Sequence, residues 1–191
     1  KKKTWLPIAI KSLRELLTQE TFDVLISTSP PVITNMIADK IHEEFDLPWV
    51  ADFRDLWTAN HYYPYGLVRK LFDRRLEIRI IKQAAALVTV SRPLSETLEA
   101  MYKGKPVFTI PNGYDPDQIE ESHLQNRFSI TYTGQLYMGK RDPELLLKVV
   151  RDLIHENMIK SDLQINFYGE KVGWLEKLIT KYGLAEIAIQ W

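Results

Sequence analysis

Short apolar runs alternate with segments of helical periodicity along this chain, and no other feature restricts its fold as much. Residues 6–19 and 32–45 carry apolar side chains at helical spacing, and the apolar run 23–27 lies between them. Another short apolar run, 48–51, follows the second of these segments. Alternating buried strands and helices form parallel sheets flanked by helices. The sequence therefore predicts an α/β, Rossmann-like fold.

The alternation occurs in two series that are separated by a polar stretch. The further elements expected in the first series are a helix over 67–85, a strand over 86–90, a helix ending near 102 and a strand over 107–110. The second series contains expected strands over 128–133, 163–168 and 185–191, with helices from 142 and over 174–182. We therefore expect a partial N-terminal domain over 1–113, a linker over 114–127 and the start of a second Rossmann-like domain over 128–191.

The composition excludes several classes of function. The 25 Lys and Arg residues balance the 25 Asp and Glu residues, so no net positive charge attracts the chain to nucleic acid. The absence of cysteine excludes disulfides and thiolate zinc sites and is compatible with a reducing compartment. No pair of histidines has a metal-binding spacing, so we expect no protein-bound metal site. We also expect no cofactor.

Several motifs resemble those of glycosyltransferase family 4, whose members have two Rossmann-like domains in the GT-B arrangement. In chain order these motifs are Pro48–Trp57, Val88–Ser91, Ile110–Asp115, Ile130–Gly134 with Lys140 six positions later, and Phe167–Gly169. Their order and spacing agree with the family over roughly residues 20–191. The resemblance implies a partial GT-B architecture that spans the end of the N-terminal, acceptor-side domain and the start of the C-terminal, nucleotide-sugar-side domain.

Two parts of the family pattern are not found in the chain. The family has a Gly-rich loop after its first strand, which nothing before Leu6 supplies, and a Glu-x7-Glu motif late in its C-terminal domain. We therefore expect the chain to be a fragment, inactive alone. A parallel sheet that is cut leaves an unpaired strand edge, so self-association into a homo-oligomer is expected, with residues 185–191 as the edge.

A donor-phosphate site is expected where the first strand of the second series ends. Gly134 lets a ligand approach the backbone, and Lys140 supplies positive charge ahead of a helix start. The family often has Arg directly after this glycine, where this chain has Gln135, and Arg141 is a candidate replacement. The alternative interpretation is a tight turn followed by solvated charges.

Three charged residues, Asp52, Arg54 and Asp55, are the catalytic candidates because they end a strand where an acceptor would meet the donor. A carboxylate at this position orients an acceptor hydroxyl or takes its proton. Arg54 stands where many relatives have His, so it supplies no general base, but it is suited to holding an anionic acceptor group such as a lipid phosphate. An Arg–Asp pair that only fixes the loop is the equally weighted alternative.

The predicted helix over 67–85 is rich in basic residues. With Leu71, Phe72, Leu76 and Ile80 facing the core, its basic side would be solvated, and Asp73 and Glu77 would interrupt the charge. The second interpretation is a peripheral contact with an anionic membrane. Its basic residues are Arg69, Lys70, Arg74, Arg75, Arg79 and Lys82.

The resemblance implies a retaining hexosyltransferase that moves a sugar from a nucleotide-sugar donor to a glycan or lipid-linked acceptor in surface polysaccharide synthesis. We expect it in the cytoplasm, at the inner face of the membrane where the acceptor is lipid-linked. Two alternatives stay open, namely a GT-B-type nucleotide-sugar epimerase and a non-catalytic domain that binds nucleotide or protein. A dehydrogenase is disfavoured, because no Gly-x-Gly-x-x-Gly follows any expected strand.

Overall fold

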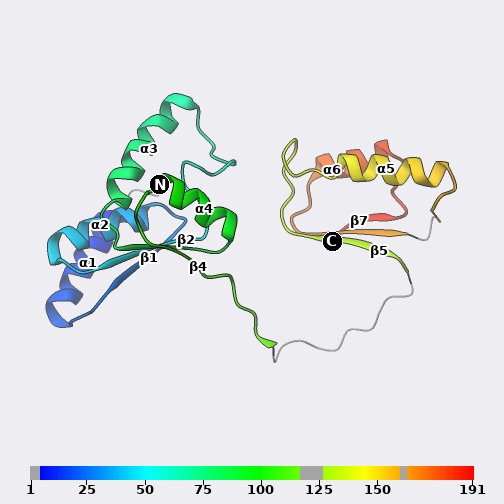
Figure 1. Cartoon of the computed structure of the whole chain (residues 1–191). Helices are drawn as coiled ribbons and strands as arrows, with labels where there is room; N and C mark the ends of the chain where they lie inside the picture. Colours follow the sequence, from blue (N-terminus) through cyan, green and yellow to red (C-terminus); the bar gives the residue numbers. More distant parts are fainter. Residues whose placement is uncertain (1–4, 117–126, 160–162) are drawn as a thin grey trace. The chain divides into compact units, whose positions relative to one another are not determined.

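The computed structural model describes residues 5–116, 127–159 and 163–191. The chain divides into two compact units, Lys1–Pro116 and Asp117–Trp191, and each unit has its own parallel sheet (Figure 1). The predicted α/β fold, with parallel sheets flanked by helices, is thus confirmed. Most of the predicted linker, residues 117–126, lies outside the described residues.

The first unit is built on a four-stranded parallel sheet with the strand order β1-β2-β3-β4. Its strands are β1 (Leu25–Ser29), β2 (Trp49–Phe53), β3 (Ala86–Thr89) and β4 (Val107–Thr109). Its helices are α1 (Leu6–Gln19), α2 (Ile33–Phe45), α3 (Leu67–Ile81) and α4 (Arg92–Met101). Because the strands are parallel, their carboxyl ends meet at one edge, where ligands bind in sheets of this kind.

One face of this sheet forms the core of the unit. Figure 1 shows α2, α3 and α4 on the same side of the strands. Trp49, Phe53 and Leu87 project to that side and are buried against Leu98 of α4. The indole nitrogen of Trp49 donates a 2.8 Å hydrogen bond to the Ser27 hydroxyl, so the buried ring is satisfied.

The second unit has a three-stranded parallel sheet with the order β5-β6-β7. Its strands are β5 (Ser129–Thr133), β6 (Gln164–Tyr168) and β7 (Ala188–Gln190), and its helices are α5 (Glu144–His155) and α6 (Gly173–Lys181). Both helices lie on one side of the sheet (Figure 1), where Leu147, Ile165 and Leu175 are buried together. The carboxyl ends of β5 and β6 again share one edge.

Two predicted elements are shorter in the structure. The predicted strand 185–191 begins only at Ala188, because the amides of Ile187 and Ala188 first bond to the carbonyl of Leu184 in a turn. The predicted helix 67–85 ends at Ile81, because the Ala85 amide bonds to the Trp49 carbonyl and begins the next strand. In both cases a turn or a sheet bond replaces the expected local periodicity.

The orientation of α3 differs from the prediction. Leu71 and Phe72, expected to face the core, are 61% and 63% exposed, whereas Asp73 and Glu77 are buried. Burial of two carboxylates is stable only when they are paired or hydrogen-bonded, and both contact the loop that precedes the helix. Within the described residues, no helix is both long and apolar enough to cross a membrane.

Candidate functional site

Arg54 links the ends of two strands in the first unit. It follows β2, and its Nε donates a 3.0 Å hydrogen bond to Asp52 Oδ2, two residues earlier on the same face of the strand. Its Nη1 donates to the side-chain oxygen of Asn112, which follows β4. The guanidinium therefore spans the carboxyl edge of the sheet from β2 to the loop after β4.

The carboxylate of Asp52 is buried at this edge. Its Oδ2 is paired with Arg54, and its Oδ1 is buried with no hydrogen-bond partner among the described residues. A buried carboxylate oxygen without a partner costs free energy, and such groups are often found where a ligand or substrate completes the bonding. Asp55, the third predicted catalytic residue, is exposed just beyond the strand.

Two serine hydroxyls of β1 make internal hydrogen bonds. Ser27 donates to Asn35 Oδ1 at 2.8 Å, and Ser29 donates to the Asp52 carbonyl at 3.4 Å. The Arg54 amide also donates to the Ser29 carbonyl, at 2.9 Å. The bond of Ser27 joins β1 to α2, and the two bonds of Ser29 position Asp52 and Arg54 beside the end of β1.

The aromatic loop before α3 is tied to that helix. Tyr63 donates a 2.7 Å hydrogen bond to Asp73 Oδ2, and Lys70 lies over the Tyr63 ring. Burial, followed by the hydrogen bond to Asp73, raises the pKa of Tyr63 to about 12. His61 is exposed, and its ring packs against Tyr62 at a centroid distance of 4.9 Å. The loop is thus tied to α3 through an acidic side chain of the helix, Asp73.

In the second unit, two glycines meet at the carboxyl ends of β5 and β6. The Gly134 amide donates a 2.9 Å hydrogen bond to the Tyr168 carbonyl, which brings the Gly134 carbonyl against Gly169. The φ angle of Gly134 is +132°, a backbone conformation that residues with a side chain rarely adopt. The chain therefore leaves β5 in a conformation that glycine allows.

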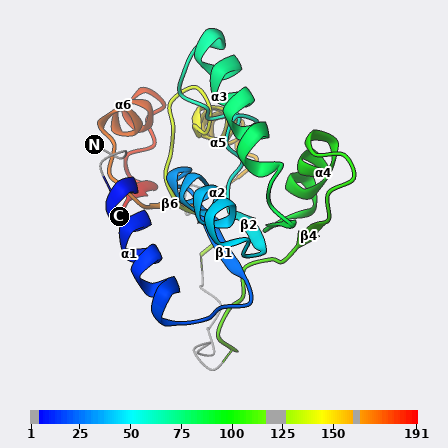
Figure 2. The same ribbon diagram turned by 90° about the vertical axis from the view of Figure 1, so that its left-hand side faces the viewer.

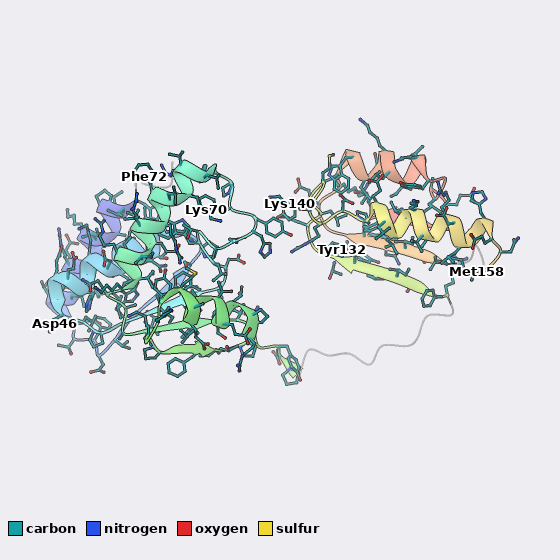
Figure 3. All side chains as sticks on the ribbon, turned by 45° about the horizontal axis from the view of Figure 1, so that its top comes forward. Asp46, Lys70, Phe72, Tyr132, Lys140 and Met158 are labelled. Atoms are coloured by element: carbon teal, nitrogen blue, oxygen red, sulfur yellow. The ribbon has the colours of Figure 1, made fainter. Side chains whose placement is uncertain are left out.

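The residues after Gly134 form a small hairpin with Lys140 at its tip. Tyr137 and Arg141 pair through two backbone hydrogen bonds, of 3.0 and 2.8 Å. Gln135 accepts a 2.6 Å bond from the Tyr137 hydroxyl, and the Arg141 guanidinium lies over the Tyr137 ring. Figure 3 shows Lys140 on the loop that leaves the sheet at the end of β5, the strand that carries Tyr132.

The N-terminus of α5 is occupied by a carboxylate of the chain itself. Asp142 accepts hydrogen bonds from the amides of Gly139, at 2.7 Å, and Glu144, at 3.1 Å. The sequence predicted a helix start at Asp142 but not this bond to the hairpin. The start of α5 is therefore already supplied with an anionic group by the chain.

The amino-acid sequence matches one family over most of the first unit. The family model described as Glycosyltransferase Family 4 matches residues 1–118. The chain belongs to glycosyltransferase family 4. The resemblance stated from the motifs is thereby confirmed. No curated protein is matched by the sequence of this family 4 chain.

Solved structures share the fold at low sequence identity. HepE from Anabaena, solved with UDP and glucose, has a TM-score of 0.69 and 12% identity, covering 97% of this chain and 50% of HepE. Sucrose-phosphate synthase from Thermosynechococcus elongatus has a TM-score of 0.71 and 11% identity, covering 99% and 50%. A putative UDP-N-acetylglucosamine 2-epimerase from Listeria monocytogenes has a TM-score of 0.53 and 13% identity, covering 97% and 50%.

This family 4 chain therefore spans about half the length of those structures, and the likeness concerns the fold alone. In the part of the chain that the structure describes, no three His, Cys, Asp or Glu side chains gather to form a metal site. The first unit thus carries the charged pair Asp52 and Arg54 at the carboxyl edge of its sheet. The second unit carries, at the carboxyl edge of its own sheet, the loop that begins at Gly134 and contains Lys140.

Proposed function

We propose that this chain is part of a retaining glycosyltransferase that moves a hexose from a nucleotide-sugar donor to a polysaccharide or lipid-linked acceptor in surface polysaccharide synthesis. The observation that carries the proposal is the Asp52 carboxylate, which is buried at the carboxyl edge of a parallel sheet. One of its oxygens is paired with Arg54, and the other has no partner in the part of the chain that the structure describes. Membership of glycosyltransferase family 4 supplies the class of reaction.

The two units would divide the substrates between them. We assign the acceptor to the domain expected over residues 1–113 and the nucleotide sugar to the domain expected over 128–191. The carboxyl edge of each sheet carries the groups that suit its ligand, carboxylates for a sugar hydroxyl and a lysine with close backbone approach for a diphosphate.

On the donor side, the role of Lys140 would be to stabilise the leaving diphosphate. Negative charge grows on the leaving group as the sugar departs, and a cation placed beforehand lowers the energy of that state. Gly134 leaves room for a phosphate near the backbone. Arg141 and Gln135 contact Tyr137 on the same hairpin, so they would shape the loop that presents Lys140.

On the acceptor side, Asp55 would orient the attacking hydroxyl, since it is exposed beyond the strand while Asp52 is buried. The role of Arg54 would be to hold Asp52 in place and to offer its exposed part to an anionic group such as a lipid phosphate. A lipid-linked acceptor would place the reaction in the cytoplasm, at the inner face of a membrane.

Product analysis of the complete protein tests the proposal. It is incubated with UDP- and GDP-sugars, with and without lipid-linked and glycan acceptors, and the products are separated by chromatography. A glycosyltransferase releases UDP or GDP only as the acceptor gains a sugar with the anomeric configuration of the donor retained. Asp55→Asn should lower this transfer by at least tenfold.

The second candidate, a nucleotide-sugar epimerase, is favoured by the structural likeness to the Listeria protein. An epimerase would change the sugar with no acceptor present. Binding of UDP or GDP with neither product would support the non-catalytic alternative. Either result would contradict the transferase proposal.

A further inference from the structure

Helix α3 turns its acidic residues inward. Asp73 receives an ion pair from Arg69 at 2.9 Å and the hydrogen bond from Tyr63. Glu77 is completely buried and accepts bonds from the amide and hydroxyl of Thr58. These are the acidic residues of α3, which lies wholly within the described residues. The carboxylates of Asp73 and Glu77 are therefore buried, so they do not interrupt the basic surface of α3.

The outward side of α3 is apolar at its start and basic further on. Leu67 and Val68 are 82% and 72% exposed, and Leu71 and Phe72 follow one turn later, also exposed. Arg75 and Lys82 lie on the same side at helical spacing and are exposed as well. We call these six residues the docking face: Leu67, Val68, Leu71, Phe72, Arg75 and Lys82.

The docking face lies on a part of the first unit that stands out from the rest. Figures 1 and 2 both show the N-terminal turns of α3 projecting beyond the other helices of this unit. In Figure 3, Phe72 and Lys70 mark this half of the helix. A surface that projects in this way can meet a flat partner without obstruction by neighbouring helices of the unit.

A groove extends this surface from α3 to α4. Its volume is about 910 Å³, and Leu67, Leu71 and Met101 contribute apolar walls. Lys70 and Arg74 add positive charge to the same groove. The carboxylate in its lining, Glu96 of α4, is paired with Arg92 at 3.0 Å. Apolar walls with basic groups match the chemistry of an anionic phospholipid, which combines acyl chains with a phosphate headgroup.

We propose that the docking face binds the surface of an anionic membrane. Exposed apolar side chains on a helix insert at the boundary of headgroups and acyl chains, and neighbouring basic residues contact the anionic headgroups. The complementarity in charge selects this partner, because α3 exposes cations and apolar groups but no carboxylate. The inference deepens the proposed function and rests on it, because a lipid-linked acceptor is the reason for the protein to bind a membrane. The loop that carries Asp55 leads directly into α3, so docking would hold the acceptor side of the unit at the membrane.

Co-sedimentation with vesicles tests the docking face without any need for catalysis. The chain is mixed with vesicles of phosphatidylcholine alone, or of phosphatidylcholine and phosphatidylglycerol in equal parts. We expect binding to the anionic vesicles only, weakening as salt is added. Leu71→Ser with Phe72→Ser should weaken this binding by at least tenfold. Arg75→Ser with Lys82→Ser should weaken it roughly 30-fold at low salt.

Matched controls remove similar groups elsewhere. Phe128→Ser with Leu145→Ser deletes two side chains that are 75% and 74% exposed in the second unit. Lys148→Ser with Lys177→Ser removes two exposed cations from α5 and α6. Both control pairs should bind anionic vesicles as the parent chain does. Circular dichroism of every variant shows whether it is folded, and the substituted positions are exposed, so folding should be kept.

The cysteine-free sequence allows a second, site-specific measurement. Phe72→Cys and, as control, Leu145→Cys are each labelled with an environment-sensitive fluorophore. Anionic vesicles should shift the emission to shorter wavelength for the label at position 72 but not at position 145. Equal shifts, or equal binding by all variants, would overturn the proposal. The proposal would also be overturned if the parent chain did not bind vesicles and formed a dimer that Leu71→Ser with Phe72→Ser converted to a monomer. The docking face would then bind a second copy of the chain. If the chain binds anionic vesicles as expected but the complete protein transfers no sugar, only the proposed function is contradicted.

Discussion

A β-carbon on Gly169 would lie 2.4 Å from the carbonyl oxygen of Gly134. Carbon and oxygen atoms that are not bonded do not approach so closely, and the oxygen belongs to backbone that the sheet holds in place. The ends of β5 and β6 can therefore meet only because residue 169 lacks a side chain. This approach positions the start of the loop that carries Lys140.

Gly169→Ala should consequently destabilise the second unit by about 1–3 kcal/mol, the usual cost of forcing an added methyl group into a packed site. Gly173→Ala is the matched control, because a β-carbon there meets no atom within 4 Å. Urea unfolding of both variants measures the difference. Equal stability of the two variants would mean that the two strand ends separate without cost.

Lys140→Ala should weaken the binding of UDP or GDP to the complete protein by about 10- to 150-fold. The reason is the loss of a charged hydrogen bond, worth about 1.5–3 kcal/mol, with about 1.4 kcal/mol for each tenfold change. Titration calorimetry measures the affinity, and Lys148→Ala, on the exposed side of α5, should bind as the parent does. If Lys140→Ala also binds as the parent does, the hairpin is only a turn.

Arg54→Met should lower the stability of the first unit by about 1–2 kcal/mol, because it leaves the Asp52 carboxylate without its cation. The double variant Arg54→Met with Asp52→Asn should recover part of the loss, since no buried charge then remains at position 52. Asn112→Ala, which removes only the outer partner of Arg54, should cost less than Arg54→Met. Thermal unfolding of the four proteins tests this order. A double variant no more stable than Arg54→Met would show that the charge of Asp52 is not what Arg54 stabilises.

Local pattern was sufficient to predict most of the fold. The helix over 6–19 has the predicted bounds, and the strands after it were placed to within about two residues, except that β7 begins three residues later than predicted. The orientation of α3 could not be predicted, because periodicity assigns Leu71 and Phe72 to the core by default. Hydrogen bonds from Thr58 and Tyr63 reverse that assignment, and they come from a loop whose conformation has no periodic signal.

The candidate site shows a similar limit. Asp52 and Arg54 were selected from their position at a strand end, and their contact follows from a spacing of two on a strand. The contact of Arg54 with Asn112 joins residues 58 positions apart, and no local pattern encodes it. Asn112 does follow a strand in the same sheet, so the rule that ligand sites collect at carboxyl ends was the signal that would have found it.

The stability of the second unit should fall in acid through Glu144. Hydrogen bonds from Lys181 and then Tyr182 hold the pKa of this carboxyl below its ordinary value of 4.5. A carboxyl whose pKa is lowered by folding adds stability above its unfolded pKa and loses it as the pH falls through the folded pKa. The melting temperature of the parent should therefore exceed that of Glu144→Gln above about pH 5, and the gap should close below about pH 4. A gap independent of pH would assign the effect to the shape of the side chain rather than to its charge.

Self-association should occur through the second face of the first sheet. Ile26, Phe108 and Ile110 are 63%, 55% and 57% exposed on this face, and apolar patches of this kind are commonly interfaces. The edge strand β7, predicted within 185–191, is the weaker candidate, because it has three residues and short edges pair poorly.

Sedimentation velocity should show a larger species as the concentration of the chain rises. Ile26→Lys with Phe108→Lys should return it to a monomer, because two cations facing each other across the interface would be desolvated. Phe128→Lys with Leu145→Lys changes two side chains of the second unit that are 75% and 74% exposed, and it should leave the association unchanged. A parent chain that stays monomeric at every concentration would refute the prediction, and an oligomer that persists in the Ile26→Lys with Phe108→Lys variant would return the edge of β7 to first place.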